Sequence, residues 1–287
     1  MGALVKNILV FGATGQVATE LQRFEGVTAL SRAEADLSDP AACAAIIAAT
    51  KADAVINAAA YTAVDKAETD TDMAFRVNVD APTAMAEAAA KRGLPFVHVS
   101  TDYVFNGSGT TPWREDDATG PLGVYGASKL QGEQGVQAVG GAHAIMRTSW
   151  VVSAHGNNFV KTMLRLGAER DRLTIVADQV GGPTCARDIA AGLMQMAEQL
   201  CDDASKSGIY HFAGGPDVSW ADFAREIFAQ AGITFEVADI LSSDFPTPAK
   251  RPGNSRMNCT KITDVFGVLR PDWRSSLTDI LTDLKAI

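Results

Sequence analysis

Leu4-Val5-Lys6-Asn7-Ile8-Leu9-Val10-Phe11 leads directly into Gly12-Ala13-Thr14-Gly15-Gln16-Val17-Ala18, close to the N-terminus. The first stretch, residues 4 to 11, predicts a buried parallel strand, and a helical pattern follows the glycines at residues 20 to 24. Glycines between a strand and a helix let the backbone turn tightly and approach a pyrophosphate, whose charge then lies at the helix N-terminus. We therefore interpret Gly12 and Gly15 as part of a dinucleotide site, with a plain loop as the alternative.

The chain continues as alternating strand-like and helical segments. Strands are expected at residues 27–30, 54–57, 94–99 and 144–151, and helices at 41–50, 71–92 and 125–133. This alternation implies an α/β fold with a Rossmann-type, doubly wound parallel sheet, which binds ligands beyond the carboxyl ends of its strands. The glycine turn, Ala60, Thr101 and Trp150 all fall at that edge.

The pattern changes after about residue 150. We expect an NAD(P)-binding Rossmann domain at 1–150 and a smaller C-terminal α/β domain at 151–287 that mainly binds substrate, with late segments that interleave back into the sheet. A turn-rich loop is expected at 179–184, a helix at 186–200 and a strand at 208–213. The basic, proline-rich stretch 246–256 is interpreted as a substrate-facing loop, and an ordinary solvated loop is the alternative.

Three residues have the right types and spacing for carbonyl chemistry. Tyr125 and Lys129 are four apart, so a helix over 125–133 places both on one face, with Cβ atoms about 5–6 Å from each other. An adjacent cation favours the phenolate and lowers the pKa of a tyrosine, which suits it to acid–base catalysis. Thr101 ends the strand Phe96-Val97-His98-Val99, where its hydroxyl can bond a substrate oxygen. The alternative is a surface tyrosine and lysine on an amphipathic helix.

Arg32 bears on the choice of cofactor. It follows the expected strand 27–30, where a dinucleotide site contacts the adenosine ribose. An acidic residue there would favour NAD, whereas a guanidinium pairs with a 2′-phosphate, so Arg32 favours NADP. A solvated arginine is the alternative.

Composition excludes several classes of protein. With 287 residues, 47% of them hydrophobic and 21% charged, the chain is globular, and it contains no apolar run of the ~20 residues needed to span a bilayer. A net charge of −9 disfavours nucleic acid and anionic membranes as partners. The four cysteines are scattered without metal-ligand spacing, so we expect buried, reduced thiols and no metal site. Without a membrane-spanning run or a signal-peptide cleavage region, we expect a cytoplasmic protein.

On these residues the chain resembles the extended short-chain dehydrogenase/reductase superfamily, and within it the dTDP-4-dehydrorhamnose reductase family. The resemblance spans nearly the whole length and is carried by the motifs at residues 12–17, 57–68, 100–105, 125–133, 147–151, 156–159 and 251–256. One departure is Ala18, where the family usually has glycine. Alanine is the smallest alternative, so we expect helix–sheet packing to tolerate it.

The resemblance implies a reaction and a set of roles. Hydride passes from NADPH, or alternatively NADH, to C4 of dTDP-4-dehydro-L-rhamnose, giving dTDP-L-rhamnose for cell-surface polysaccharide. Tyr125 donates the proton, Lys129 lowers the pKa of Tyr125 and holds the nicotinamide ribose, and Thr101 bonds the reacting oxygen. The further cofactor contacts implied are Gly12, Gly15, Gln16, Val17, Arg32, Asp36, Leu37, Ala59, Ala60, Tyr61, Thr62 and Tyr103. The dTDP-sugar contacts implied are Asp102, Trp150, Asn158 and Arg251. The resemblance is also compatible with a homodimer.

Other functions stay open on the sequence. A nucleotide-sugar 4,6-dehydratase shares the tyrosine and lysine but typically has Thr-Asp-Glu, and Tyr103 replaces that glutamate here. A non-catalytic, cofactor-binding regulatory subunit similar to that of methionine adenosyltransferase would favour a degraded triad, whereas Thr101, Tyr125 and Lys129 are intact. Another nucleotide-sugar reductase is the third alternative.

Overall fold

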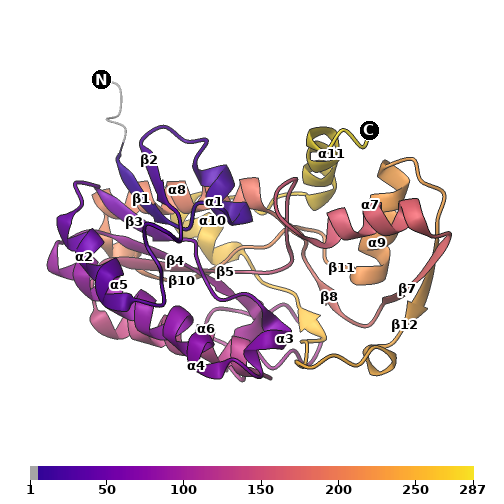
Figure 1. Cartoon of the computed structure of the whole chain (residues 1–287), viewed down its shortest axis with the longest axis horizontal. Helices are drawn as coiled ribbons and strands as arrows, with labels where there is room; N and C mark the ends of the chain where they lie inside the picture. The colour runs from indigo at the N-terminus through magenta and orange to yellow at the C-terminus, as the bar shows by residue number, and fades with distance from the viewer. Residues whose placement is uncertain (1–5) are drawn as a thin grey trace.

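The computed structural model describes residues 6 to 287, and its larger part is built on a six-stranded parallel sheet (Figure 1). The strand order is β10-β5-β4-β3-β1-β2. The strands are β1 (Ile8–Phe11), β2 (Val27–Leu30), β3 (Ala54–Asn57), β4 (Phe96–Thr101), β5 (His143–Thr148) and β10 (Gly208–His211). The predicted Rossmann-type fold is confirmed. The strand predicted at 4–11 begins at Ile8, and residues 4 and 5 lie outside the described residues.

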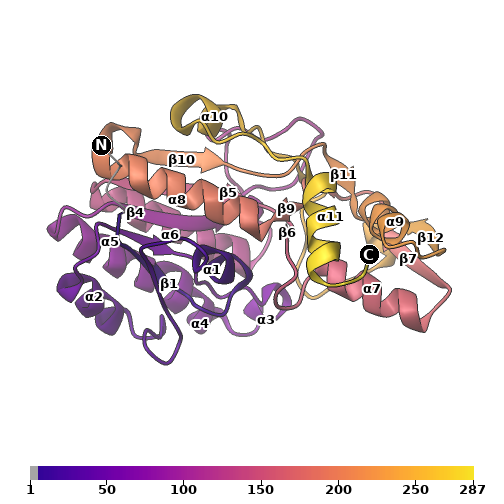
Figure 2. The same ribbon diagram turned by 90° about the horizontal axis from the view of Figure 1, so that it is seen from above.

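Helices cover both faces of this sheet (Figures 1 and 2). One face packs against α2 (Pro40–Ala49), α5 (Ala81–Lys91) and α6 (Val124–Val139), and the other against α1 (Gln16–Leu21), α8 (Ala186–Asp202) and α10 (Thr260–Phe266). Each strand of the sheet centre is buried on both faces, which is why its sequence is continuously apolar. No helix within residues 6–287 is long and apolar enough to cross a membrane.

The helical segment predicted at 71–92 is interrupted. It consists of α4 (Thr71–Phe75), a π-helical turn at Arg76–Asp80 and α5. Pro82 lies at the start of α5, where its missing N–H costs least, and the π turn before it absorbs the irregularity. The turn directs the side chain of Asn78 into the interior, where it is 1% exposed.

The smaller part of the molecule is a second cluster of short elements. Its strands pair as β7 with β12, as β11-β8-β13, and as β6 with β9. These strands are β6 (Val151–Val152), β7 (Arg172–Val176), β8 (Val180–Gly181), β9 (Thr184–Cys185), β11 (Val218–Ser219), β12 (Glu236–Ile240) and β13 (Asn254–Ser255). Its helices are α7 (Phe159–Glu169), α9 (Trp220–Gln230) and α11 (Trp273–Asp283). The loop predicted at 179–184 was wrong, because β8 and the start of β9 lie in it.

The chain passes back and forth between the two parts. After β6 and α7 it returns to the large sheet through α8 and β10, leaves again through α9 and β12, and comes back with α10 (Figure 1). Short elements complete the path: α3 (Val64–Ala67) and the 3-10 turns at Asp102–Val104, Ala204–Lys206 and Ser242–Asp244. Of the four free cysteines, Cys43, Cys185 and Cys259 are buried as predicted, whereas Cys201 is partly exposed.

Candidate active site

A cleft of about 460 Å³ opens at the carboxyl edge of the large sheet. Its walls come from the glycine turn, the segments after β3 and β4, the first turns of α6, and the segment from β5 into β6. This is the edge at which a parallel doubly wound sheet binds its ligand. Gly156 and Asn157, which precede α7, close the cleft from the smaller part of the molecule.

Most residues predicted for the site line this cleft. They are Gly15, Gln16, Val17, Ala59, Ala60, Thr62, Thr101, Asp102, Tyr103, Tyr125, Lys129 and Trp150. Seven others lie outside its lining: Gly12, Arg32, Asp36, Leu37, Tyr61, Asn158 and Arg251. Further lining residues for which the sequence predicted no role are Thr14, Ala58, Val64, Val99, Ser100, Thr148, Ser149, Val151, Gly156 and Asn157.

Two glycines set the position of α6, the helix that carries Tyr125 and Lys129. A Cβ atom on Gly126 would lie 2.2 Å from the carbonyl oxygen of Tyr103, and one on Gly132 would lie 2.0 Å from that of Asn78. The helix therefore lies against the neighbouring backbone at Gly126 and again at Gly132. Tyr125 and Lys129 are thereby held over β4 at the floor of the cleft.

Burial sets the protonation state of both residues. It raises the pKa of Tyr125 to about 12, a rise that the neighbouring Thr101 hydroxyl opposes and the Asp102 carboxylate adds to. It also lowers the pKa of Lys129 to about 8, against the opposing charge of Glu133. Desolvation outweighs the Thr101 hydrogen bond, so in this structure the pKa of Tyr125 shifts upward, opposite to the direction that the sequence predicted.

Lys129 is fixed from below by β4. Its Nζ lies 2.7 Å from the carbonyl oxygen of Val99 and 3.1 Å from Nε2 of His98. His98 Nδ1 in turn lies 3.2 Å from Nδ2 of Asn57 on the adjacent strand β3. Sequence reasoning assigned no role to His98 or Asn57, although a histidine within the apolar run of residues 96–99 was a signal that could have found them.

Asn78 connects the cleft wall to α6. Its side chain accepts a hydrogen bond from the Tyr61 amide (2.9 Å) and donates to the Tyr61 carbonyl (3.1 Å) and to Ser128 Oγ (3.0 Å). Asn78 thus satisfies both backbone polar groups of Tyr61 and joins that segment to Ser128 of α6. Tyr61 itself is turned away from the cleft, and its hydroxyl donates to Asp70.

Three buried oxygens at the cleft have no protein partner. They are Oδ2 of Asp102, Oγ of Ser100 and Oγ1 of Thr148. Burial raises the pKa of the Asp102 carboxyl to about 6, a rise that the nearby Ser255 and Thr101 hydroxyls oppose. Buried polar atoms usually have partners, so these atoms are ready to bond a polar ligand.

The glycine turn has the open shape that a dinucleotide requires. Gly12 has φ +100° and passes so close to Ala59 that a Cβ atom would lie 3.1 Å from the Ala59 Cβ. At Gly15 a Cβ atom would meet nothing within 4 Å, so the backbone there is open to a ligand. These residues and the unpartnered oxygens fit a polar, phosphate-bearing ligand.

Asn158 stabilises the end of the cleft that faces this turn. Its side chain caps α7 by accepting from the Lys161 amide (3.2 Å), and it donates to Gln16 Oε1 (2.9 Å). The Gln16 oxygen also accepts from the Ser153 hydroxyl at 2.7 Å. Asn158 thus ties the two parts of the molecule together beside the cleft instead of lining it.

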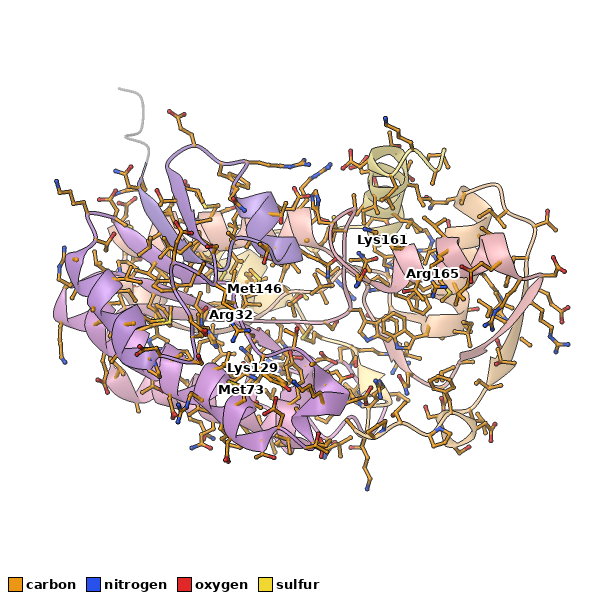
Figure 3. All side chains as sticks on the ribbon, in the orientation of Figure 1. Arg32, Met73, Lys129, Met146, Lys161 and Arg165 are labelled. Atoms are coloured by element: carbon orange, nitrogen blue, oxygen red, sulfur yellow. The ribbon has the colours of Figure 1, made fainter. Side chains whose placement is uncertain are left out.

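The charged residues outside the lining are mostly paired. Arg32 bonds Asp36 at 3.2 Å with its side chain 79% exposed, and Leu37 beside them is buried. Arg251 binds both carboxylate oxygens of Asp65, at 2.8 and 3.1 Å. Lys161 and Arg165 lie along α7 (Figure 3), where Arg165 is paired with Glu169. Within the described part of the chain, no group of three or more His, Cys, Asp or Glu could hold a metal ion.

Comparisons with known proteins identify the family to which the chain belongs. The family model described as RmlD substrate binding domain matches residues 6–286. A dTDP-4-dehydrorhamnose reductase of Sinorhizobium fredii is 43% identical over 280 residues, which are 94% of this chain and 95% of that protein. The crystal structure of a dTDP-4-dehydrorhamnose reductase from Clostridium acetobutylicum superposes with a TM-score of 0.90 at 37% identity, covering 97% of this chain and 99% of that one.

A second solved structure is that of the dTDP-4-dehydrorhamnose reductase from Bacillus anthracis in complex with NADP. It has a TM-score of 0.89 and 31% identity, and covers 98% of this chain and all of that one. A family model over nearly the whole chain, relatives above 40% identity and the same fold lead to one conclusion. The chain belongs to the dTDP-4-dehydrorhamnose reductase family.

Proposed function

We propose that this protein is a dTDP-4-dehydrorhamnose reductase, which reduces the C4 ketone of dTDP-4-dehydro-L-rhamnose to give dTDP-L-rhamnose. The observation that carries the proposal is that Thr101, Tyr125 and Lys129 line one cleft together with the glycine turn. The relatives named for this activity align over nearly the full chain and support the choice of reaction.

A reduced nicotinamide dinucleotide, when bound, supplies the hydride. Tyr125 donates the proton to the developing alkoxide, and its pKa of about 12 keeps the phenol protonated at neutral pH, as a reduction requires. Thr101 contacts the phenol and bonds the same substrate oxygen. Lys129, when charged, stabilises the phenolate left after proton transfer.

We propose NADPH as the preferred cofactor, with NADH as the alternative. The reductase from Bacillus anthracis was solved in complex with NADP. Arg32 is the residue assigned to the 2′-phosphate, because it follows β2 and its guanidinium is exposed. The turn at Gly12–Val17, the segment Ala59–Thr62, Asp36, Leu37 and Tyr103 are the other cofactor contacts proposed.

The dTDP-sugar is assigned to the side of the cleft that faces the smaller part of the molecule. Asp102 presents an unpartnered buried oxygen there, and Trp150 stacks on Trp220 with ring centroids 3.5 Å apart. We propose that residues 1–150 mainly bind the cofactor and residues 151–287 mainly bind the substrate. Within the second segment, β10 belongs to the large sheet, and α8 and α10 pack against that sheet. Arg251 becomes a substrate contact only if the ligand displaces its bond to Asp65.

The non-catalytic regulatory role is disfavoured by the cleft itself. A chain that only binds a cofactor has no use for a tyrosine phenol, a buried lysine and a threonine hydroxyl in one cleft, yet all three line it. A cytoplasmic location and a homodimer stay predictions. Fractionation of the producing cells and sedimentation of the purified protein check them.

The decisive experiment follows oxidation of NADPH and NADH by the purified protein with dTDP-4-dehydro-L-rhamnose. Tyr125→Phe removes the proton donor, so we expect kcat to fall about 10²–10⁴-fold. Tyr210→Phe is the matched control, because Tyr210 lies on β10 away from the cleft and its hydroxyl donates to the Lys206 carbonyl. If the dinucleotide binds but the wild type does not turn over, the named reaction is wrong.

A further inference from the structure

Below the cleft floor, three buried side chains form a continuous hydrogen-bonded row from β3 through β4 to α6. Asn57 and His98 are register partners on adjacent strands, and Lys129 reaches down to them from α6. Their exposed fractions are 0, 1 and 1%. At this depth solvent water does not satisfy a missing hydrogen bond, so each contact in the row needs one donor and one acceptor.

A backbone amide fixes the direction in which these hydrogen bonds are donated. The Ala59 amide lies 3.2 Å from Oδ1 of Asn57, and an amide N–H can only donate. The Asn57 oxygen therefore faces Ala59, and its Nδ2 donates to Nδ1 of His98. A neutral imidazole that accepts at Nδ1 carries its proton on Nε2, so the ring donates toward Lys129 Nζ at 3.1 Å.

Only one form of Lys129 completes this arrangement. An ammonium has three donors and no lone pair, whereas a neutral amine can accept from His98 while it donates to the Val99 carbonyl at 2.7 Å. A charged Lys129 would require His98 to carry its proton on Nδ1 instead. That proton would face the Asn57 Nδ2 hydrogens, leaving two buried donors in opposition.

We propose that Asn57 and His98 are positioning residues that hold Lys129 as a neutral amine until a dinucleotide binds, so that binding is coupled to uptake of one proton from solvent at this lysine. The inference rests on the proposed function for the binding step alone. Bound ribose and phosphate oxygens favour the ammonium, and the ammonium is the form that stabilises the phenolate of Tyr125.

The electrostatic surroundings agree with the geometry. Burial lowers the pKa of Lys129 to about 8 and also holds the pKa of His98 well below its ordinary value. The other titratable groups facing the row are Tyr125 and Glu133 of α6, Asp102 after β4 and Arg147 of β5. Glu133 is already bound by Arg147 in a two-point ion pair.

The other groups at the site do not titrate in the window used for the test. Asp102, with a pKa of about 6, is ionised above pH 8, and Tyr125, with a pKa of about 12, stays protonated. Lys129 is therefore the group at the cleft whose charge changes between pH 7.5 and 9.5.

The first test titrates the cofactor-free protein labelled with ¹³C-lysine, with the Lys129→Met spectrum identifying the Lys129 signal. We expect a midpoint about 2 units below the ordinary lysine value of roughly 10.4. In His98→Gln the amide oxygen can accept from an ammonium without opposing Asn57, so the midpoint should rise by about one unit or more. A wild-type midpoint near the ordinary value, or an unchanged one in His98→Gln, would overturn the proposal.

The second test measures proton uptake when NADPH binds, by calorimetry at pH 9 in buffers of different ionisation enthalpy. An amine with a midpoint near 8 is about one-tenth charged at this pH, so we expect uptake of about 0.9 proton per site. His98→Gln should take up less than about half of that, and His143→Gln, altered at the far end of β5, should match the wild type. Binding without uptake contradicts the coupling. Failure to bind NADPH at all contradicts the proposed function instead, while the ¹³C titration still decides the state of Lys129.

Discussion

Two arginine–carboxylate pairs, each joined at two points, lie at different depths below and beside the cleft. Arg147 and Glu133 form a two-point pair beneath the floor, at 2.9 and 2.7 Å, with 2 and 1% of their side chains exposed. Arg251 and Asp65 form another at the rim, at 2.8 and 3.1 Å, with 29 and 41% exposed. Removing one partner of a buried pair leaves the other charge without a counterion in a low dielectric. At an exposed pair, water solvates the remaining charge. We therefore expect the pair beneath the floor to stay formed, whereas the pair at the rim can open at little cost.

The floor pair also holds neighbouring elements together. The Arg147 guanidinium lies 5.0 Å from the centre of the Phe105 ring and 3.4 Å from Nε2 of His211 on β10. Burial lowers the pKa of His211 to about 3, so this ring is neutral and adds no second positive charge beside the arginine. Glu133 lies one turn beyond Lys129 on α6, so the pair fixes the helix that carries the site.

Removing one partner of the floor pair should have the largest effect on stability. Glu133→Gln leaves the Arg147 charge buried without its counterion, so we expect a loss of about 3–5 kcal/mol in the free energy of unfolding. Urea unfolding followed by circular dichroism measures this loss. Replacing both residues, with Glu133→Leu and Arg147→Met, removes the stranded charge and should restore most of it. A double variant as unstable as the single one would show that the pair itself supplies the stability.

Replacing Asn158, the helix cap that joins the two parts of the molecule, should have the second-largest effect on stability. Asn158→Ala removes the cap of α7 and the bond to Gln16, so we expect a loss of about 1–2 kcal/mol in stability together with a raised KM for the dinucleotide. Asp272→Ala removes the cap of α11, a helix whose residues do not line the cleft, and should lower stability by about 1 kcal/mol with KM unchanged. Equal KM values in both variants would show that Asn158 acts on the fold alone.

The sequence predicted the large sheet well because its signal is local. Segments 27–30 and 54–57 coincide with β2 and β3, since buried parallel strands are continuously apolar and end at turns. The strands β8 and β9 escaped prediction because two residues carry no periodicity. They exist only through pairing with distant segments.

Only those parts of the site that depend on local sequence spacing were predicted. Tyr125 and Lys129 are four residues apart, so their joint placement follows from helix geometry alone. The bond between Arg251 and Asp65 joins residues 186 positions apart, and the contact of Asn57 with His98 depends on the register of two strands. Neither is encoded in a local pattern. Arg251 was consequently assigned to the substrate without its carboxylate partner, and His98 was given no role.

The rim pair should contribute little to stability and should do so only above acidic pH. The bond from Arg251 lowers the pKa of Asp65, so the pair stabilises the protein above the unfolded-state pKa of about 3.9 and loses its effect as pH falls through the lower folded-state value. We expect Asp65→Asn to lose about 1 kcal/mol or less at pH 7, because both side chains are partly exposed. Urea unfolding at pH 7 and pH 2.5 should show the difference from wild type shrinking toward zero. A difference that persists at pH 2.5 would assign it to packing.

The smallest effect is expected at Arg32. Its side chain is 79% exposed and bonds Asp36, which competes with a 2′-phosphate for the guanidinium. We therefore expect Arg32→Ser to lower the preference for NADPH over NADH in kcat/KM only about three-fold, which is below 1 kcal/mol, and to leave stability unchanged. Arg172→Ser, which breaks an equally exposed pair with Glu236 in the smaller part of the molecule, should change neither. A loss of preference of about a hundred-fold would mean that Arg32 leaves Asp36 when the cofactor binds, so that an exposed pair that adds little to stability would decide cofactor recognition.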